Sequence, residues 1–272
     1  MGSRFEEFIN GLWDSITPSY TFEANTQCGT HVHTSPSTDF TTDKVKAVAR
    51  AALHFEEAIN ALVPEHRRGN YFCKTFLASN PNFQGKTVEE AIALVDQKQD
   101  LEGVCGLMNP NNDRYYTWNF TSLTKHSTIE FRQPPGVTTA AAALGWVEFT
   151  ATFVRAAFAV AGLDGDLGGP GGGPSGGAGS DGGLGGFGKD VGGLKKFLEK
   201  GLLRGVRSKS GEDIVKGVNS KVKDSDRVPG KAPQKLDEKA KKAFEEKKKQ
   251  DKLGIVFLNK MEMAIKCNFK GV

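Results

Sequence analysis

The sequence predicts an α+β domain in which helices pack on one face of a sheet and polar side chains line a cleft on its other face. Helix signals and short segments of alternating polarity fill the first 161 residues. A glycine-rich window follows, because 17 of the 33 glycines fall within residues 162–193. We therefore expect a folded front, a glycine-rich linker and a basic, partly disordered carboxy-terminal region.

Charge supports the same division of the chain. Residues 1–161 carry 13 Lys and Arg against 17 Asp and Glu, whereas residues 162–272 carry 23 against 15. This asymmetry excludes a uniformly basic nucleic-acid-binding domain, and we expect no specific nucleic-acid partner. The predicted divisions are a domain over 1–161, a linker over 162–193, a short docking helix over 194–207 and a basic, largely disordered or helical tail over 208–272.

The expected location is the cytoplasm. The first residues include Glu6 and Glu7 and no apolar run of the length that a secretory signal needs. The four cysteines lie far apart and never form C-x-x-C, which favours reduced thiols over disulfides or a zinc knuckle. The apolar stretch Ala140–Leu163 contains Glu148 and Arg155, so we interpret it as a buried helix and expect no membrane span.

Three helices are predicted in the front domain. The first begins at the cap residues around Thr41 and ends at Pro64, with apolar residues at helical spacing between them. The second starts with Thr87 and Glu90, which have the spacing of a capping box. The third covers residues 139–161. The apolar face of the first helix is expected to pack on the sheet.

Three strands are predicted from alternation with a period of two, over residues 29–34, 115–121 and 128–132. Each alternation gathers polar side chains on one face and apolar side chains on the other. The polar faces carry His31, His33, Asn119, Glu130 and Arg132. Three such strands predict a sheet that lines a polar cleft.

Each of these polar residues also has an ordinary interpretation when it is considered alone. Two histidines at i and i+2 can bind a divalent cation or contact a phosphoryl group, and they can equally be hydrogen-bonded residues of a polar face. Glu130 with Arg132 is more often a surface ion pair. Arg67 and Arg68 can clamp a phosphate or a carboxylate, or can form a solvated helix end.

The order and spacing of the motifs carry more information than any one of them. The strings are C-G-T-H-V-H at residues 28–33, P-E-H-R-R-G-N-Y-F-C at 64–73, Y-Y-T-W-N at 115–119 and T-I-E-F-R at 128–132, with Gly136 and Trp146 after them. Over residues 22–160 this arrangement resembles the amidoligase family, and the first and last strings are its most specific parts.

The resemblance implies a fold similar to those of glutamine synthetase and glutamate-cysteine ligase, in which an antiparallel sheet forms a cleft for nucleotide and metal. It implies an ATP-dependent carboxylate-amine ligase that acts through an acyl phosphate, with ATP and Mg²⁺ as cofactors. The substrate would be a small molecule or a peptide with a carboxylate and an amine.

The resemblance also implies roles for individual residues. Glu130 would hold Mg²⁺ through oxygen, and His31 or His33 would contact the metal or a phosphate. Arg132, together with Arg67 or Arg68, would meet the phosphoryl group or the substrate carboxylate. Asn119 would orient one of these groups.

Two departures from the family pattern keep alternatives open. Family members carry closely spaced glutamates on a strand before C-G-x-H-V-H, whereas here Glu6 and Glu7 lie in a predicted amphipathic helix. After T-I-E-F-R the family often has a histidine, whereas this chain has Gln133. A degenerate member that binds a nucleotide or an acidic peptide without turnover is therefore the second hypothesis. A metal hydrolase built on His31 and His33 is weaker, because no third ligand stands at zinc spacing.

Overall fold

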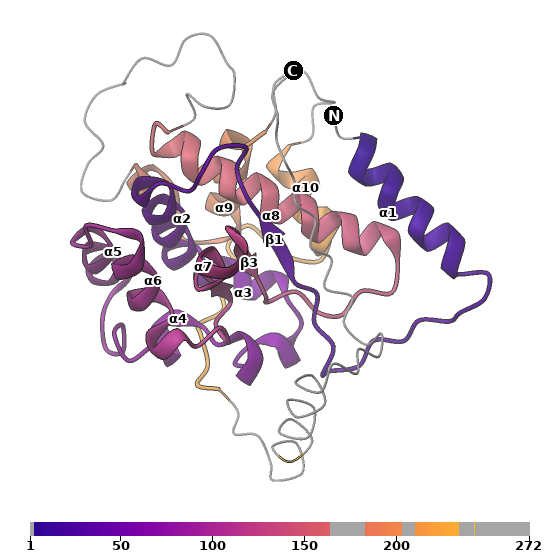
Figure 1. Ribbon diagram of the computed structural model, residues 1–272, viewed down its shortest axis with the longest axis horizontal. Coiled ribbons are helices and arrows are strands. Elements are labelled where there is room, and N and C mark those ends of the chain that lie inside the picture. The colour runs from indigo at the N-terminus through magenta and orange to yellow at the C-terminus, as the bar shows by residue number, and fades with distance from the viewer. Residues whose placement is uncertain (1–2, 164–182, 203–209, 234–241, 243–272) are drawn as a thin grey trace.

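A three-stranded antiparallel sheet and ten α-helices form the described part of the chain, residues 3–163, 183–202, 210–233 and 242 of a computed structural model (Figure 1). The elements are, in order, α1 Ser3–Ile16, β1 Val32–Thr34, α2 Thr42–His54, α3 Glu56–Leu62, η1 Glu65–Arg67, η2 Tyr71–Cys73, α4 Phe76–Ser79, α5 Val88–Asp96, α6 Leu101–Met108, η3 Pro110–Asn112, β2 Trp118–Asn119, α7 Ser122–His126, β3 Ile129–Phe131, α8 Ala140–Val160, η5 Leu184–Gly186, α9 Val191–Lys200 and α10 Gly211–Val218, where η marks a 3₁₀ turn. The predicted α+β class is confirmed. Much of the predicted linker, residues 164–182, lies outside the described residues.

The sheet has the order β1-β3-β2, with β3 in the middle and antiparallel to both neighbours. The strands are shorter than the alternating segments that predicted them, because the flanks pair irregularly. Gly29 forms an isolated bridge with Pro135, and Tyr116 forms one with Lys74. The alternation therefore extends beyond the regular ladder and still assigns side chains to faces.

Helix starts follow the predicted caps. Thr41 accepts a hydrogen bond from the backbone N–H of Lys44, and Thr87 with Glu90 forms the full capping box at the start of α5. The predicted first helix is divided at Phe55, whose backbone (φ −101°, ψ 12°) ends α2 and begins α3. The ring of Phe55 is buried at this break, with its centroid 4.7 Å from that of Phe197.

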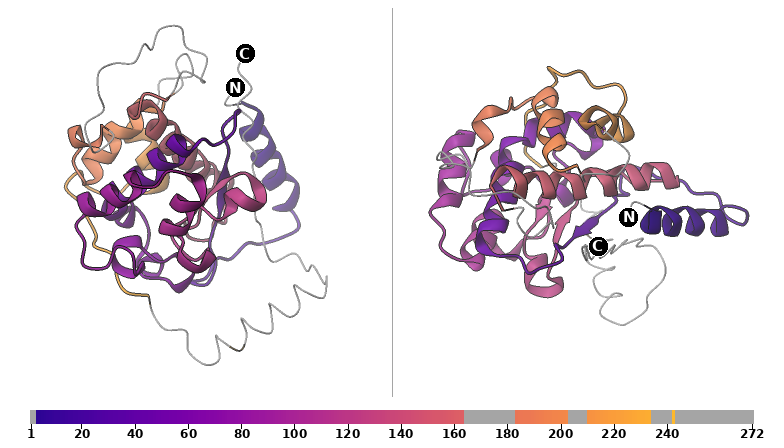
Figure 2. Two further views of the ribbon diagram at one scale, coloured as in Figure 1. Left: turned by 60° about the vertical axis from the view of Figure 1, so that its left-hand side comes forward. Right: turned by 90° about the horizontal axis from the view of Figure 1, so that it is seen from above.

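Helix α8 forms the centre of the core. It lies between the sheet and the α9/α10 pair, as the view from above in Figure 2 shows. Phe153 of α8 stacks at 5.0 Å on Trp118 of β2 and lies 5.3 Å from Phe197 of α9, so aromatic rings join the three layers. This helix is long and apolar enough to cross a membrane, but most of it is buried within the fold, as expected of a core helix.

The chain after the glycine-rich window adds to the same core. Leu194, Phe197 and Leu198 of α9 are fully buried, and Ile214 and Val215 of α10 are buried against α8 and α9. Helix α9 therefore packs on the front domain. Helix α10 lies within the segment predicted to be a largely disordered or helical tail.

Residues 219–233 then cross back over α3. The backbone N–H of Val228 donates to the carbonyl of Glu57 at 3.0 Å, and Asn60 Nδ2 donates to the carbonyl of Val228 at 3.0 Å. Asn219 Nδ2 donates to the carbonyl of Leu62, also at 3.0 Å. These side-chain and backbone bonds join the described end of the chain to its front half.

Glu56 is a buried carboxyl at the start of α3, and it accepts hydrogen bonds from the backbone N–H groups of Phe76 and Leu77. Burial raises its pKa from 4.5 to about 7, although the two backbone donors oppose that rise. Between these values the folded protein holds a proton that the unfolded chain releases. The contribution of this proton to stability is therefore complete below about pH 4.5 and is lost as the pH rises through about 7.

We expect Glu56→Gln to remove this pH dependence, because an amide does not titrate. The difference in unfolding free energy between wild type and variant should fall by about 3 kcal/mol between pH 4.5 and pH 8. Chemical denaturation at several pH values measures it, and Glu102→Gln, at an exposed position of α6, is the matched control. A difference that stayed constant over this range would contradict the assignment.

Candidate functional site

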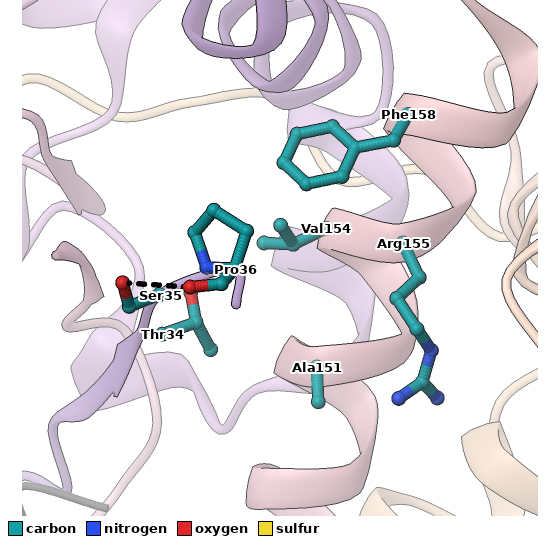
Figure 3. A pocket seen from close by; sticks show the side chains of 7 residues that line it. All are labelled: Thr34, Ser35, Pro36, Ala151, Val154, Arg155 and Phe158. Atoms are coloured by element: carbon teal, nitrogen blue, oxygen red, sulfur yellow. Dashed lines mark hydrogen bonds between the residues drawn. The ribbon is translucent and has the colours of Figure 1, made fainter. Parts of the chain in front are cut away.

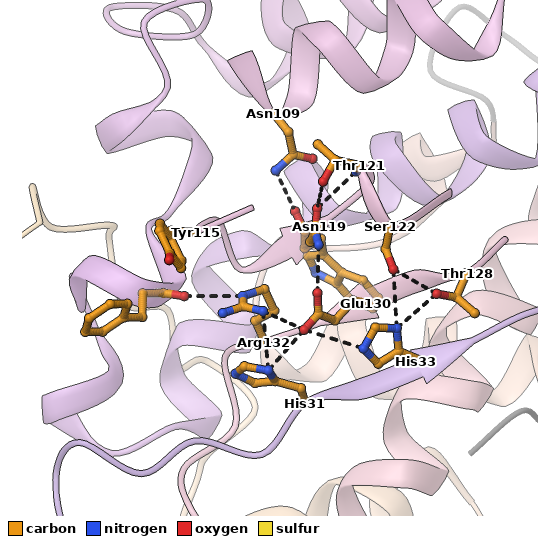
Figure 4. A network of polar contacts seen from close by, with 12 residues as sticks. His31, His33, Asn109, Tyr115, Asn119, Thr121, Ser122, Thr128, Glu130 and Arg132 are labelled. Atoms are coloured by element: carbon orange, nitrogen blue, oxygen red, sulfur yellow. Dashed lines mark hydrogen bonds and ion pairs between the residues drawn. The ribbon is translucent and has the colours of Figure 1, made fainter. Parts of the chain in front are cut away.

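The sheet register brings the predicted polar residues together. Glu130 in the central strand pairs with His33 of β1 on one side and with Asn119 of β2 on the other. Residues that pair across an antiparallel ladder share a face, so the three side chains point the same way. His31 and Arg132, two residues along their chains, extend this face. Figure 4 shows the resulting cluster.

Glu130 is the centre of the cluster, and both of its oxygens are engaged. Its Oε2 accepts a 2.7 Å hydrogen bond from Asn119 Nδ2, and its Oε1 accepts one of 2.5 Å from Arg132. His31 Nδ1 lies 3.0 Å and His33 Nε2 lies 3.6 Å from the same Oε1. The Glu130 and Arg132 side chains are only 5% and 4% exposed, so they form a buried ion pair and not the surface pair that Glu130 with Arg132 alone would suggest.

His31 can satisfy only one of its two neighbours through Nδ1. That atom lies 3.0 Å from a Glu130 oxygen, which accepts, and 3.3 Å from an Arg132 nitrogen, which can only donate. The shorter, charge-assisted contact assigns the proton to Nδ1, which donates to Glu130. The lone pair of His31 is then on Nε2.

Two hydroxyl groups support His33 on its other side. Its Nδ1 lies 2.9 Å from the Thr128 hydroxyl and 3.4 Å from that of Ser122, and the two hydroxyls are 2.9 Å apart. Ser122 and Thr128 are buried, so these bonds fix the imidazole rather than bind a ligand. Thr128 is two residues from Glu130 and could have been found by alternation, whereas no sequence pattern indicated Ser122.

Arg67 is buried next to the cluster, and its side chain binds backbone carbonyl groups. Its guanidinium donates to the carbonyls of Arg132 at 2.8 Å and Gln133 at 3.0 Å. A Cβ on Gly29 would lie 2.8 Å from the same guanidinium, which explains the glycine in the C-G-T-H-V-H string. Arg67 therefore contributes charge and anchors the end of β3.

Arg68 does not join the cluster. Its Nε donates to the carbonyls of Asn60 at 2.9 Å and Val63 at 3.0 Å, so it binds the end of α3. Of the predicted site residues, the structure thus brings together His31, His33, Asn119, Glu130 and Arg132. It places Arg67 against the backbone of Arg132 and Gln133, and it directs Arg68 to a helix end.

The surroundings of Glu130 and His31 determine the protonation states of these two side chains. Burial alone would raise the pKa of Glu130, but the contacts from His31 and His33 and the charge of Arg132 outweigh it and hold that pKa well below its ordinary range. Burial lowers the pKa of His31, and the charges of Arg132 and Arg67 add to this against the opposing bond to Glu130. Glu130 is therefore ionised at neutral pH, and a neutral His31 still donates through Nδ1–H.

The cluster carries an excess of positive charge. Arg67 and Arg132 are both buried guanidinium groups, and guanidinium stays charged in proteins. Glu130 is the carboxylate in contact with Arg132, while Arg67 is bound to carbonyl oxygens. Two cations with one anion favour the approach of a further anion, such as a carboxylate or a phosphoryl group.

The same arrangement does not fit a protein-held divalent cation. The described residues contain no group of three or more His, Cys, Asp or Glu side chains arranged to hold a metal ion. Glu130 already accepts bonds at both oxygens, one of them from Arg132, and guanidinium repels a cation. A metal at this site would need further oxygen ligands from its substrate.

A small apolar pocket lies on the other face of the sheet (Figure 3). Thr34 alternates with His33, so its side chain faces α8 and not the cluster. The lining residues are Thr34, Ser35, Pro36, Ala151, Val154, Arg155 and Phe158. This pocket is therefore separate from the polar cluster.

Comparison with known proteins points to one family. A family model described as "Putative amidoligase enzyme" matches residues 6–154, which is more than half of the chain and includes all of the cluster. No curated protein and no solved structure gives a match.

Proposed function

Because this chain belongs to the amidoligase family, which indicates a ligase-type function on small-molecule substrates, we propose that it is an ATP-dependent carboxylate-amine ligase. The observation that carries this proposal is the buried cluster with two guanidinium groups and one carboxylate. Such a cluster favours anions, and both the substrate carboxylate and the phosphates of ATP are anions. We also propose that the small antiparallel sheet is glutamine-synthetase-like and that its polar face borders a cleft.

The proposed reaction has two steps. A carboxylate oxygen attacks the γ-phosphorus of ATP, the bond from that phosphorus to the bridging oxygen breaks, and ADP leaves. The amine nitrogen then attacks the acyl carbon, phosphate leaves and the nitrogen loses a proton. Arg132 and the charge of Arg67 stabilise the anionic groups, while Glu130 and Asn119 hold Arg132 and His31 in place. His31 Nε2 is able to take the proton.

Mg²⁺ is proposed only as the ion that accompanies ATP. Among the described residues, no side chains form a cage for it, and phosphate oxygens with water are its usual ligands in nucleotide sites. No step above therefore depends on a metal held by Glu130 or His31.

Calorimetric titration with ATP, with and without Mg²⁺, tests the proposal. Wild type should bind Mg·ATP, and Glu130→Ala that is still folded by circular dichroism should bind it at least tenfold more weakly, because Arg132 has lost the carboxylate that positions it. Glu102→Gln, at an exposed position of α6, should bind as wild type does. Mixtures of carboxylic acids and amines should then release ADP and phosphate in equal amounts with the amide. Absence of nucleotide binding by a folded wild type, at either Mg²⁺ level, would overturn the proposal.

A catalytically degenerate binding protein is the second candidate, and one observation favours it. Both oxygens of Glu130 are engaged by protein groups, which leaves the cluster without a carboxylate free for chemistry. Such a protein would bind nucleotide or an acidic peptide without consuming it. Nucleotide binding without release of ADP for any acid and amine pair would support this candidate over the ligase.

A further inference from the structure

Three aromatic side chains lie together beside the polar cluster. This aromatic rim consists of Tyr71 and Phe72 from η2 and Tyr115 from the approach to β2. Their ring centroids are 5.3 to 5.9 Å apart, within the range of aromatic pairs. All three are partly exposed, whereas Trp118 and Phe131 on the opposite face of the sheet are fully buried. Clustered rings that remain accessible to solvent are typical of binding surfaces.

Arg132 connects the aromatic rim to the cluster. Its guanidinium carbon lies 5.7 Å from the centre of the Tyr115 ring, and its Nε donates to the carbonyl of Phe72 at 3.4 Å. The same side chain contacts Glu130 and His31. Figure 4 shows Tyr115 next to Arg132, on the side away from Ser122 and Thr128. A group that packed on the aromatic rim would therefore be separated from Glu130 and His31 by the Arg132 side chain.

The charges beside the aromatic rim have a positive sum, because Asp113, which accepts a hydrogen bond from the backbone N–H of Tyr115, is balanced by Lys74. Arg114 is exposed, and its guanidinium lies 5.3 Å from the centre of the Tyr115 ring. Lys74 lies over the rings of Tyr71 and Tyr116, but it is paired with Asp113. Arg114 thus adds to the excess positive charge of the cluster, and the combination favours a ligand with an aromatic ring and a nearby anion.

We propose that the aromatic rim binds the side chain of an aromatic amino acid, free or at a peptide carboxyl end, whose carboxylate lies toward Arg132 and Arg114. This inference rests on the proposed function, because it names the class of acid that the ligase activates. The base of ATP fits less well here. Ribose and two phosphates separate the base from the γ-phosphate, whereas Arg132 alone separates the rim from Glu130.

The test uses N-acetyl-L-phenylalanine as the probe, because it has the ring and the carboxylate but no amine. Ligand-detected NMR titration without ATP measures its affinity for the full chain. Wild type should bind N-acetyl-L-phenylalanine at least tenfold more tightly than it binds N-acetylglycine, which lacks the ring. The same margin is expected over N-acetyl-L-phenylalaninamide, in which an amide replaces the carboxylate. Tyr115→Ala and Tyr71→Ala should each weaken binding about tenfold, and Tyr20→Ala, at a tyrosine 67% exposed after α1, should not.

The outcomes separate this inference from the proposed function. The proposed binding at the aromatic rim would be overturned if wild type bound the three probes equally or bound none of them. It would also be overturned if both rim variants kept full affinity. Binding at the rim without ADP release in the full reaction would refute the ligase alone. If wild type released ADP with acids that have no aromatic ring, and Tyr115→Ala released it at the same rate, only the proposed binding at the aromatic rim would be refuted. Unfolding transitions identify any variant that has lost its fold. If one of the two rim variants is unfolded, the affinity of the other rim variant tests the proposal.

Discussion

Replacing Glu130 with alanine should lower the free energy of unfolding by about 3–5 kcal/mol, the usual result of removing one partner of a buried ion pair. The guanidinium of Arg132 would stay buried without the carboxylate that now lies 2.5 Å away. His31 and Asn119 would lose their acceptor as well. Denaturation followed by tryptophan fluorescence measures the loss, because Trp118 is packed against Phe131 of the same sheet.

A double variant identifies the cause of that loss. Glu130→Ala combined with Arg132→Met removes the unpaired charge and keeps an apolar side chain of similar length. It should therefore recover most of the stability that Glu130→Ala loses, although neither variant should form ADP in the ligation assay. If the two substitutions instead reduced stability additively, the buried charge would not be the reason for the loss.

Gly201→Ala should destabilise the protein by about 3 kcal/mol, because α9 ends in direct contact with the backbone of α8. A Cβ at this position would lie 2.2 Å from the carbonyl oxygen of Thr152 and 2.6 Å from the nitrogen of Ala156. Neither backbone atom can move without shifting α8, and the Gly201 carbonyl also accepts a 2.7 Å bond from Arg155. The backbone of Gly201 (φ −94°) is one that alanine adopts, so packing alone causes the effect.

Gly11→Ala is the matched control for this substitution. Gly11 lies within α1, and a Cβ there would have no atom within 4 Å. Alanine should therefore stabilise the helix by up to about 1 kcal/mol. Urea denaturation of both variants measures the contrast. Equal stability of Gly201→Ala and wild type would show that α9 is not part of the cooperative core.

The polar cluster could be predicted because it depends on two local rules. Alternation placed His31 with His33 and Glu130 with Arg132, and pairing across neighbouring strands brought the two sets together. The position of Arg67 could not be predicted in this way. Its partners are carbonyl groups 65 and 66 residues away, and a backbone acceptor leaves no trace in the side-chain pattern.

The fold was predictable where a capping residue marks the start of a helix. The capped helices α5 and α8 begin at the predicted residues. The division at Phe55 could not be predicted, because the ring that packs on Phe55 there, Phe197, lies beyond the glycine-rich window. Helix α10 buries only Ile214 and Val215 among its large apolar residues, so its pattern resembles a solvated segment.

Asn60 joins three parts of the chain that are far apart in sequence. Its Nδ2 donates to the carbonyl of Val228, its Oδ1 accepts a 2.5 Å bond from Gln133, and its carbonyl accepts from Arg68. Gln133 in turn is bound by Arg67 at the end of β3. Partial opening of the chain near Val228 would therefore be transmitted to the strand that carries Glu130. Amide protons of β3 should exchange with solvent only through openings that approach global unfolding, so that the cluster and the crossing segment behave as one cooperative unit.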